Sequence, residues 1–186
     1  MVTKRATDLR IVGGDPALDL ANTREGTDCP DTLVDFDELV AWATKVGVLD
    51  RPLDPANGER ALEAARRLRT ATFAVFDGIA RGGEPPAGEV EHLVAAAAEA
   101  TAHARLSGTA FVWDGDDAMR AVWPFATAAV DLLRFGPLDR IKTCDVCPWL
   151  FIDASRNHSR RWCSMDECGV RDKMQRYRAR RATAGR

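Results

Sequence analysis

Four of the five cysteines fall in one short segment near the C-terminus, and their spacing constrains the fold of that segment more than any other feature. Two residues separate Cys144 from Cys147, and fifteen residues further on, four residues separate Cys163 from Cys168. A Cys-x2-Cys turn places two thiolates on one side of a tight loop, where they can occupy two corners of a tetrahedron. The apolar stretch 149–152 predicts a strand that returns the chain as a hairpin, so the second pair completes the site.

The expected occupant of this site is one structural zinc ion per chain. The sequence begins with no apolar signal segment, and clustered cysteines in such a chain favour a metal over disulfides. Soft thiolate ligands favour zinc, with an iron–sulfur cluster as the alternative. Four protein ligands leave no position for a substrate, so the ion would fold a segment too short to bury its own core. His158 could replace one thiolate, whereas Cys29 lies in a loop-like stretch and is expected to be an ordinary small residue.

Charge is distributed unevenly along the chain. Residues 1–139 hold 14 Lys and Arg against 23 Asp and Glu, a balance of −9. Residues 140–186 hold 12 against 5, a balance of +7. Clustered basic residues are typical of a segment that binds a polyanion, and nucleic acid is the natural candidate. The alternative is that the basic segment pairs with the acidic part of the same chain.

Eight basic residues are the candidate DNA contacts. They lie in the loop between the cysteine pairs and on the helix expected after the last cysteine: Arg156, Arg160, Arg161, Arg171, Lys173, Arg176, Arg178 and Arg180. The helical period places Arg171 and Arg178 on one face and Lys173, Arg176 and Arg180 on another. A helix anchored by a metal and basic on two sides is suited to follow phosphates or to enter a groove of DNA.

The chain before the cysteines has the apolar periodicity of helices. Apolar residues recur every three or four positions in four stretches, at about 36–46, 59–80, 88–105 and 118–135. Residues 9–12 and 107–117 predict short strands, and 17–23 predicts a short helix or an irregular segment. The fold class is therefore α+β, with a mostly helical body of residues 1–137 and a small finger of hairpin and helix, residues 138–186. The division falls at the turn-like pair Gly136–Pro137, so the body is expected to fold without the finger.

Several side-chain orientations follow from this apolar periodicity. In the second helix, Arg66, Arg67 and Arg69 are expected to face largely away from the core. In the third helix, four apolar side chains are expected to face inward: Val90, Leu93, Val94 and Ala97. In the last helix, Pro124 marks either a true start or a kink.

Two motifs resemble known families. Trp162-Cys163-Ser164-Met165 followed by Cys168-Gly169-Val170-Arg171, with the preceding Cys-x2-Cys pair and the Arg160-Arg161 pair, resembles the CGNR zinc finger. Val170 stands where that family has the asparagine of its name. The segment Ala17-Leu-Asp-Leu-Ala-Asn-Thr23 resembles the start of the ABATE domain that usually precedes this finger. The resemblance implies a bacterial stress-induced transcription regulator, in which a treble-clef-like finger binds DNA and the ABATE domain senses a ligand.

Three polar residues of the ABATE-like segment are candidates for a ligand pocket. They are Asp19, Asn22 and Thr23, which could equally cap a helix or brace a turn. The leading hypothesis is thus a DNA-binding regulator, expected as a homodimer on two half-sites. One alternative is an RNA-binding or protein-assembly module whose fold is stabilised by zinc. The other is an enzyme with its pocket in the body. The body has no recognisable catalytic motif, so the prediction is that the protein is not an enzyme.

The expected location is the cytoplasm, without a membrane partner. No uninterrupted apolar stretch approaches the roughly 18 residues needed to span a bilayer.

Overall fold

The computed structural model of the chain describes residues 5–24 and 31–184, and Cys29 lies outside them. The body contains five helices in this part of the chain: α1 (Pro16–Ala21), α2 (Phe36–Val46), α3 (Gly58–Ala80), α4 (Ala87–Ala102) and α5 (Trp123–Phe135). The strands form two antiparallel hairpins: β1 (Arg105–Ser107) with β2 (Ala110–Val112), and β3 (Ile141–Thr143) with β4 (Leu150–Ile152). Short turns and the last helix complete the order: η1 (Ala6–Asp8), η2 (Ala118–Ala121), η3 (Leu138–Arg140), the π-helical turn η4 (Met165–Gly169) and α6 (Val170–Ala184). The α+β class with a C-terminal hairpin-and-helix finger is confirmed.

Local sequence signals set most helix ends. The side chain of Asp35 accepts a hydrogen bond from the Glu38 amide at 2.9 Å and caps α2. Gly47 ends α2 in the left-handed conformation, at φ 85°, which costs glycine little. Pro124 lies in the first turn of α5, where its missing amide proton is not needed, so it starts the helix and does not kink it.

Some strand and helix predictions were wrong in detail. Residues 9–12 form no strand, because no other strand lies alongside them; the amide of Val12 instead donates to Asp19. The stretch 107–117 contributes to a hairpin that begins at Arg105, and α4 correspondingly stops at Ala102. The expected strand is therefore one half of a two-stranded sheet.

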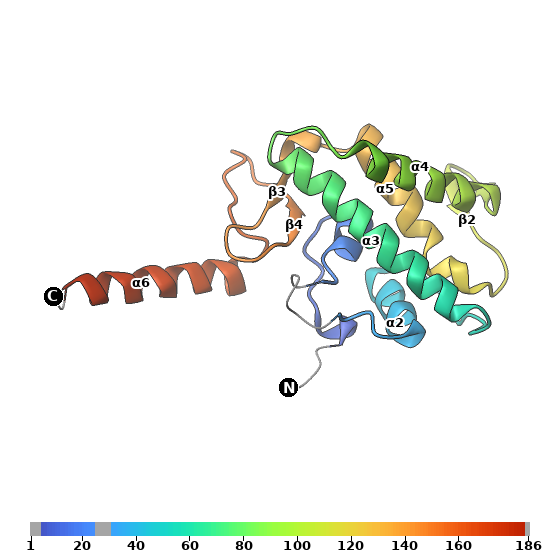
Figure 1. The fold of residues 1–186 in the computed structure, drawn as a ribbon, viewed down its shortest axis with the longest axis horizontal. Helices are drawn as coiled ribbons and strands as arrows, with labels where there is room; N and C mark the ends of the chain where they lie inside the picture. Colours follow the sequence, from blue (N-terminus) through green and yellow to red (C-terminus); the bar gives the residue numbers. More distant parts are fainter. Residues whose placement is uncertain (1–4, 25–30, 185–186) are drawn as a thin grey trace.

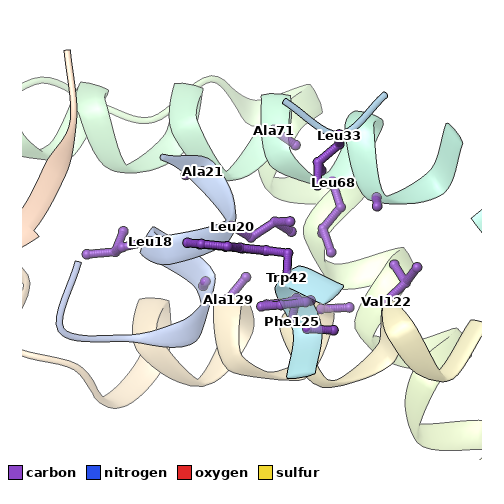
Figure 2. Packing of buried hydrophobic residues seen from close by; sticks show 14 of the residues in the cluster. Leu18, Leu20, Ala21, Leu33, Trp42, Leu68, Ala71, Val122, Phe125 and Ala129 are labelled. Atoms are coloured by element: carbon purple, nitrogen blue, oxygen red, sulfur yellow. The ribbon is translucent and has the colours of Figure 1, made fainter. Parts of the chain in front are cut away.

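The core lies where α1, α2, α3 and α5 meet. Trp42 of α2 is fully buried at its centre (Figure 2). Leu20 of α1 and Phe125 of α5, which are also fully buried, belong to the same cluster, and Leu68 of α3 is 1% exposed. The second helical layer, α4, packs against α3 and α5.

Two side chains of the body do not lie as predicted. Arg69 of α3 points into the molecule and its side chain is only 5% exposed, because its guanidinium binds both carboxylate oxygens of Asp31 at 2.6 Å. Pairing with a carboxylate makes burial of an arginine tolerable. Val94 of α4 is 52% exposed, although Leu93 beside it is fully buried.

The finger lies against the end of the body rather than apart from it. In Figure 1 the hairpin of β3 and β4 lies at the C-terminal end of α3, and α6 extends away from the rest of the molecule. Leu150 and Phe151 of β4 are fully buried and belong to the same hydrophobic cluster as the body residues. That the body folds without the finger stays a prediction, and this shared cluster is an argument against complete independence.

Candidate metal centre and nucleic-acid interface

The four cysteines predicted as ligands come together at the finger. Their sulfur atoms all lie within 4.8 Å of one another. The Sγ of Cys147 is 3.6 Å from that of Cys163 and 3.7 Å from that of Cys168, and the last two are 3.7 Å apart. A regular tetrahedron with zinc–sulfur bonds of about 2.3 Å spaces its corners by about 3.8 Å. The spacing therefore fits one zinc ion.

The electrostatics of the cluster also suit a dication. Contact with the Cys147 thiol, together with burial, raises the pKa of Cys163 above its ordinary value. Burial raises the pKa of Cys168 to about 12. Four thiolates at this distance repel one another, and a bound Zn²⁺ offsets that repulsion and favours the deprotonated ligands. His158, the alternative ligand, is exposed and in the left-handed conformation at φ 50°, outside the cluster.

Each ligand is positioned by a different local structure. Cys144 and Cys147 flank the tight turn between β3 and β4, and the amide of Cys144 donates to the carbonyl of Trp149 at 2.9 Å. Cys163 ends the long loop after β4. Cys168 lies in η4, the π-helical turn that leads directly into α6, so the metal anchors the start of α6.

A buried ion pair holds the loop between the two cysteine pairs. Lys142 of β3 donates to the carboxylate of Asp153 at 2.6 Å, and the carboxylate also accepts from the amides of Ser155 and Arg160. Burial opposes ionisation of Asp153, but hydrogen bonds from Lys142 and Ser155 outweigh it and lower its pKa. The sequence reasoning missed this pair. The signal available for it was an acid three residues before the first arginine of a basic loop.

Arg160 stabilises the finger itself. Its Nε donates to the carbonyl of Trp162 at 2.8 Å, and its Nη2 donates to the carbonyl of Cys163. The guanidinium carbon also lies 4.8 Å from the centre of the Phe151 ring, within range of a cation–π contact. A DNA contact by Arg160 stays a prediction. Replacing Arg160 would disturb the backbone at Cys163, which is a predicted zinc ligand.

The remaining loop arginines are more accessible. Arg161 is 57% exposed and pairs with Asp145 at 2.6 Å, and Arg156 is exposed. Arg161 also lines a cleft of about 490 Å³ between the C-terminal end of α3 and the finger. Arg81 of α3 and Lys142 of β3 line the same cleft. Basic side chains of the finger and of the body therefore meet at this cleft, although Asp145 also lines it and Arg81 pairs with Asp77. Sequence reasoning did not foresee this meeting.

The helix α6 carries the other five predicted contacts, and all five are exposed: Arg171, Lys173, Arg176, Arg178 and Arg180. Arg176 pairs with Asp172 one turn earlier, at 2.9 Å. The side chains of Arg171, Lys173 and Arg178 make no hydrogen bond or ion pair within the described part of the chain. Figure 1 shows α6 projecting from the finger without another helix beside it.

The three candidate pocket residues instead contact backbone and neighbouring side chains. Asp19 accepts hydrogen bonds from the amides of Val12 and Gly13 at 3.0 and 2.7 Å, and Thr23 donates to the carbonyl of Leu20. Gly13 is required here, because a Cβ would lie 2.8 Å from the Cβ of Leu18. These contacts match the alternative of a braced turn.

Of the three candidate pocket residues, Asn22 has the contact that reaches farthest along the chain. Its Oδ1 accepts from the amide of Leu150, and its Nδ2 donates to the carbonyl of Leu150, both at 2.8 Å. The side chain thus pairs with the outer edge of β4 as a neighbouring strand would. On the same side of the finger, Arg10 donates to Ser164 at 2.9 Å and lies 3.5 Å from Glu167. These contacts fasten the N-terminal segment of the body to the finger.

The fold and the site together define a zinc-finger protein with a helical N-terminal body. Comparison with protein families agrees: residues 14–136 match the ABATE model, described as "Putative stress-induced transcription regulator", and residues 140–181 match the CGNR zinc finger. The chain belongs to the ABATE family, and the resemblance predicted from its motifs is confirmed. A search among curated proteins found no match. Within the described residues, none of the helices combines the length and the apolar character needed to cross a bilayer.

Proposed function

We propose that this protein is a DNA-binding transcription regulator in which zinc anchors a basic helix and the helical body senses a small molecule. The family description supports regulation, and the zinc finger supports a role in binding. A homodimer in the cytoplasm, reading two half-sites, is the arrangement that such a regulator would use. Neither family described for the chain is enzymatic by name, which supports a binding protein over an enzyme.

One observation carries the DNA-binding part of this proposal. Helix α6 extends from the zinc site into solvent, with exposed Arg and Lys on more than one side. An isolated helix of about 15 residues is marginal in water, so a partner that packs against it would stabilise it. The alternative, that the basic segment pairs with the acidic body, lacks support: Arg171, Lys173 and Arg178 contact no acid in the residues described. Phosphates of DNA would supply the missing anions.

The test replaces the three unpaired residues together. The variant Arg171→Gln, Lys173→Gln and Arg178→Gln removes three positive charges and breaks no side-chain hydrogen bond or ion pair in the described part of the chain. If each residue meets one phosphate, the slope of log K against log salt should flatten by about three units on duplex DNA. Affinity should fall on every DNA sequence, since phosphate contacts carry no sequence information. Binding is measured by fluorescence anisotropy from low to physiological salt on zinc-loaded protein.

A matched control removes three exposed arginines from the body. Arg60→Gln, Arg105→Gln and Arg134→Gln changes the net charge by the same amount, and surface ion pairs such as Arg60 with Glu99 contribute little to stability. Equal loss of affinity in the two triple variants would refute a specific role for α6. A finger that prefers single-stranded RNA, or shows no affinity for duplex DNA, would favour the RNA-binding or assembly alternative. Arg160 is left unchanged in both variants, because it holds the carbonyl of Cys163.

A further inference from the structure

Three apolar side chains on one side of α6 are exposed to solvent, and we call them the apolar face of α6. Val170, Met174 and Tyr177 follow one another at intervals of four and three residues, which places their side chains on the same side of an α-helix. They are 51%, 46% and 54% exposed. Figure 1 shows α6 projecting away from the rest of the molecule, and Tyr177 contacts Arg181 of the same helix. The apolar face of α6 is therefore open to a partner.

Basic side chains border the apolar face of α6 on both sides. Each helical residue is rotated by about 100° from the one before it. Arg171 and Arg178 therefore lie along one border, and Lys173 and Arg180 lie along the other. The side chains of Arg171, Lys173 and Arg178 make no hydrogen bond or ion pair in the described part of the chain. A partner that matches this surface is apolar along its middle and negatively charged along both margins.

We propose that the apolar face of α6 lies in the major groove of double-stranded DNA and recognises the methyl groups of thymine. This inference rests on the proposed function and adds a sequence preference to it. The major groove is about 12 Å wide and admits an α-helix, and a phosphate backbone runs along each of its margins. The thymine methyl is the apolar group on its floor. The two basic borders of α6 would then reach the phosphates of the two strands.

The length and chemistry of the apolar face set what it can recognise. Val170 and Tyr177 are seven residues apart, which corresponds to about 10 Å along the helix and to about three base pairs of DNA. Val170 and Met174 carry no strong hydrogen-bond donor or acceptor, so they cannot read the polar edges of the bases. Contact with a methyl group is the discrimination left to them. The finger is therefore expected to prefer A·T base pairs.

Charge argues against a second copy of α6 as the partner. A second helix packed on this face would bring its own basic borders alongside Arg171 and Lys173, and like charges that oppose each other across an interface are unfavourable. The start of α6 also suits a groove-binding helix. Cys168, a predicted zinc ligand, lies two residues before Val170, so a bound ion would fix the direction in which the apolar face points.

The test compares thymine with uracil, which lacks only the methyl group. An alternating A·T duplex, and the same duplex with deoxyuridine in place of thymidine, are titrated with the zinc-loaded full chain and followed by fluorescence anisotropy. Burial of one methyl group changes affinity about fourfold, so the uracil duplex should bind at least about fourfold more weakly. In an alternating G·C duplex, 5-methylcytosine adds a methyl group at the same position of the groove. It should strengthen binding by a similar factor.

Substitutions assign the effect to α6. Val170→Ser with Met174→Gln removes apolar contacts but no positive charge, so it should abolish the preference for thymine over uracil and leave the salt dependence of binding unchanged. The control, Val94→Ser with Leu106→Gln, makes comparable changes at exposed positions of the body and should keep the preference. Circular dichroism checks that the variants are folded, and the comparison of thymine with uracil on the unaltered protein does not depend on them.

Several results would overturn the proposal. Equal affinity for the thymine and uracil duplexes, or a preference that survives in the α6 double variant, would show that this face does not read methyl groups; DNA binding itself would remain. A preference for A·T over G·C that persists with uracil would place the contact in the minor groove. Self-association without DNA that the double variant abolishes, measured by sedimentation velocity, would assign the face to a second copy. Absence of affinity for every duplex would instead overturn the proposed function, and this inference with it.

Discussion

Replacing Asn22 by leucine should weaken the attachment of the finger to the body. Asn22 is 2% exposed and makes two hydrogen bonds of 2.8 Å to the backbone of Leu150. Leucine has the same number of side-chain heavy atoms with the same branching, so the change removes both hydrogen bonds and leaves no empty space. It leaves the amide and the carbonyl of Leu150 buried without a partner on that edge of β4.

The magnitude follows from these two groups. A buried donor or acceptor that loses its partner costs about 1–3 kcal/mol, so two such groups predict a loss of about 2–6 kcal/mol in the free energy of unfolding. For a chain of this length, about 3 kcal/mol corresponds to a fall in melting temperature of about 6–12 °C. Both quantities are measured by urea unfolding and thermal melts of zinc-loaded protein, followed by far-UV circular dichroism.

Asn157→Leu serves as the matched control. Asn157 is exposed in the loop of the finger, where the same chemical change should alter stability by less than about 0.5 kcal/mol. If Asn22→Leu and Asn157→Leu unfold at the same urea concentration, the hydrogen bonds of Asn22 do not hold the finger, and the reasoning is wrong.

Two further predictions concern zinc and pH. Removing zinc with a strong chelator should leave most of the helical signal but lower the melting temperature of the body, because Leu150 and Phe151 lose their anchored position in the shared cluster. Adding zinc back should restore the original melting temperature. A melting temperature that does not change on chelation would contradict this prediction. Burial raises the pKa of Asp19 from 3.8 to about 6, so the native state binds its proton more tightly than the unfolded state, and the resulting stabilisation is lost as pH rises through 6. Between pH 5 and pH 7.5 this loss is about 1 kcal/mol, measured as the change in the stability difference between the wild type and Asp19→Asn; a difference that does not change with pH would refute it.

The sequence by itself was sufficient where the decisive interactions are local. The spacing of Cys144, Cys147, Cys163 and Cys168 predicted both the cluster and its zinc, since short turns and one ion determine the arrangement. Helix α2 was predicted with its ends because capping and termination by Gly47 depend on residues a few positions away.

Tertiary structure decided the features that depend on partners distant in the sequence. Arg69 was expected at the surface from its place on the helix, but the burial of its guanidinium depends on Asp31, which lies 38 residues away. Asn22 offered no local sign that it would pair with Leu150, 128 residues further along the chain. Arg160 looked like its neighbour Arg161 in the sequence, yet the first supports the backbone of a zinc ligand and the second faces solvent. A periodic pattern reports which face of an element is apolar, whereas the role of a polar side chain depends on which donor or acceptor the folded chain brings within hydrogen-bonding distance.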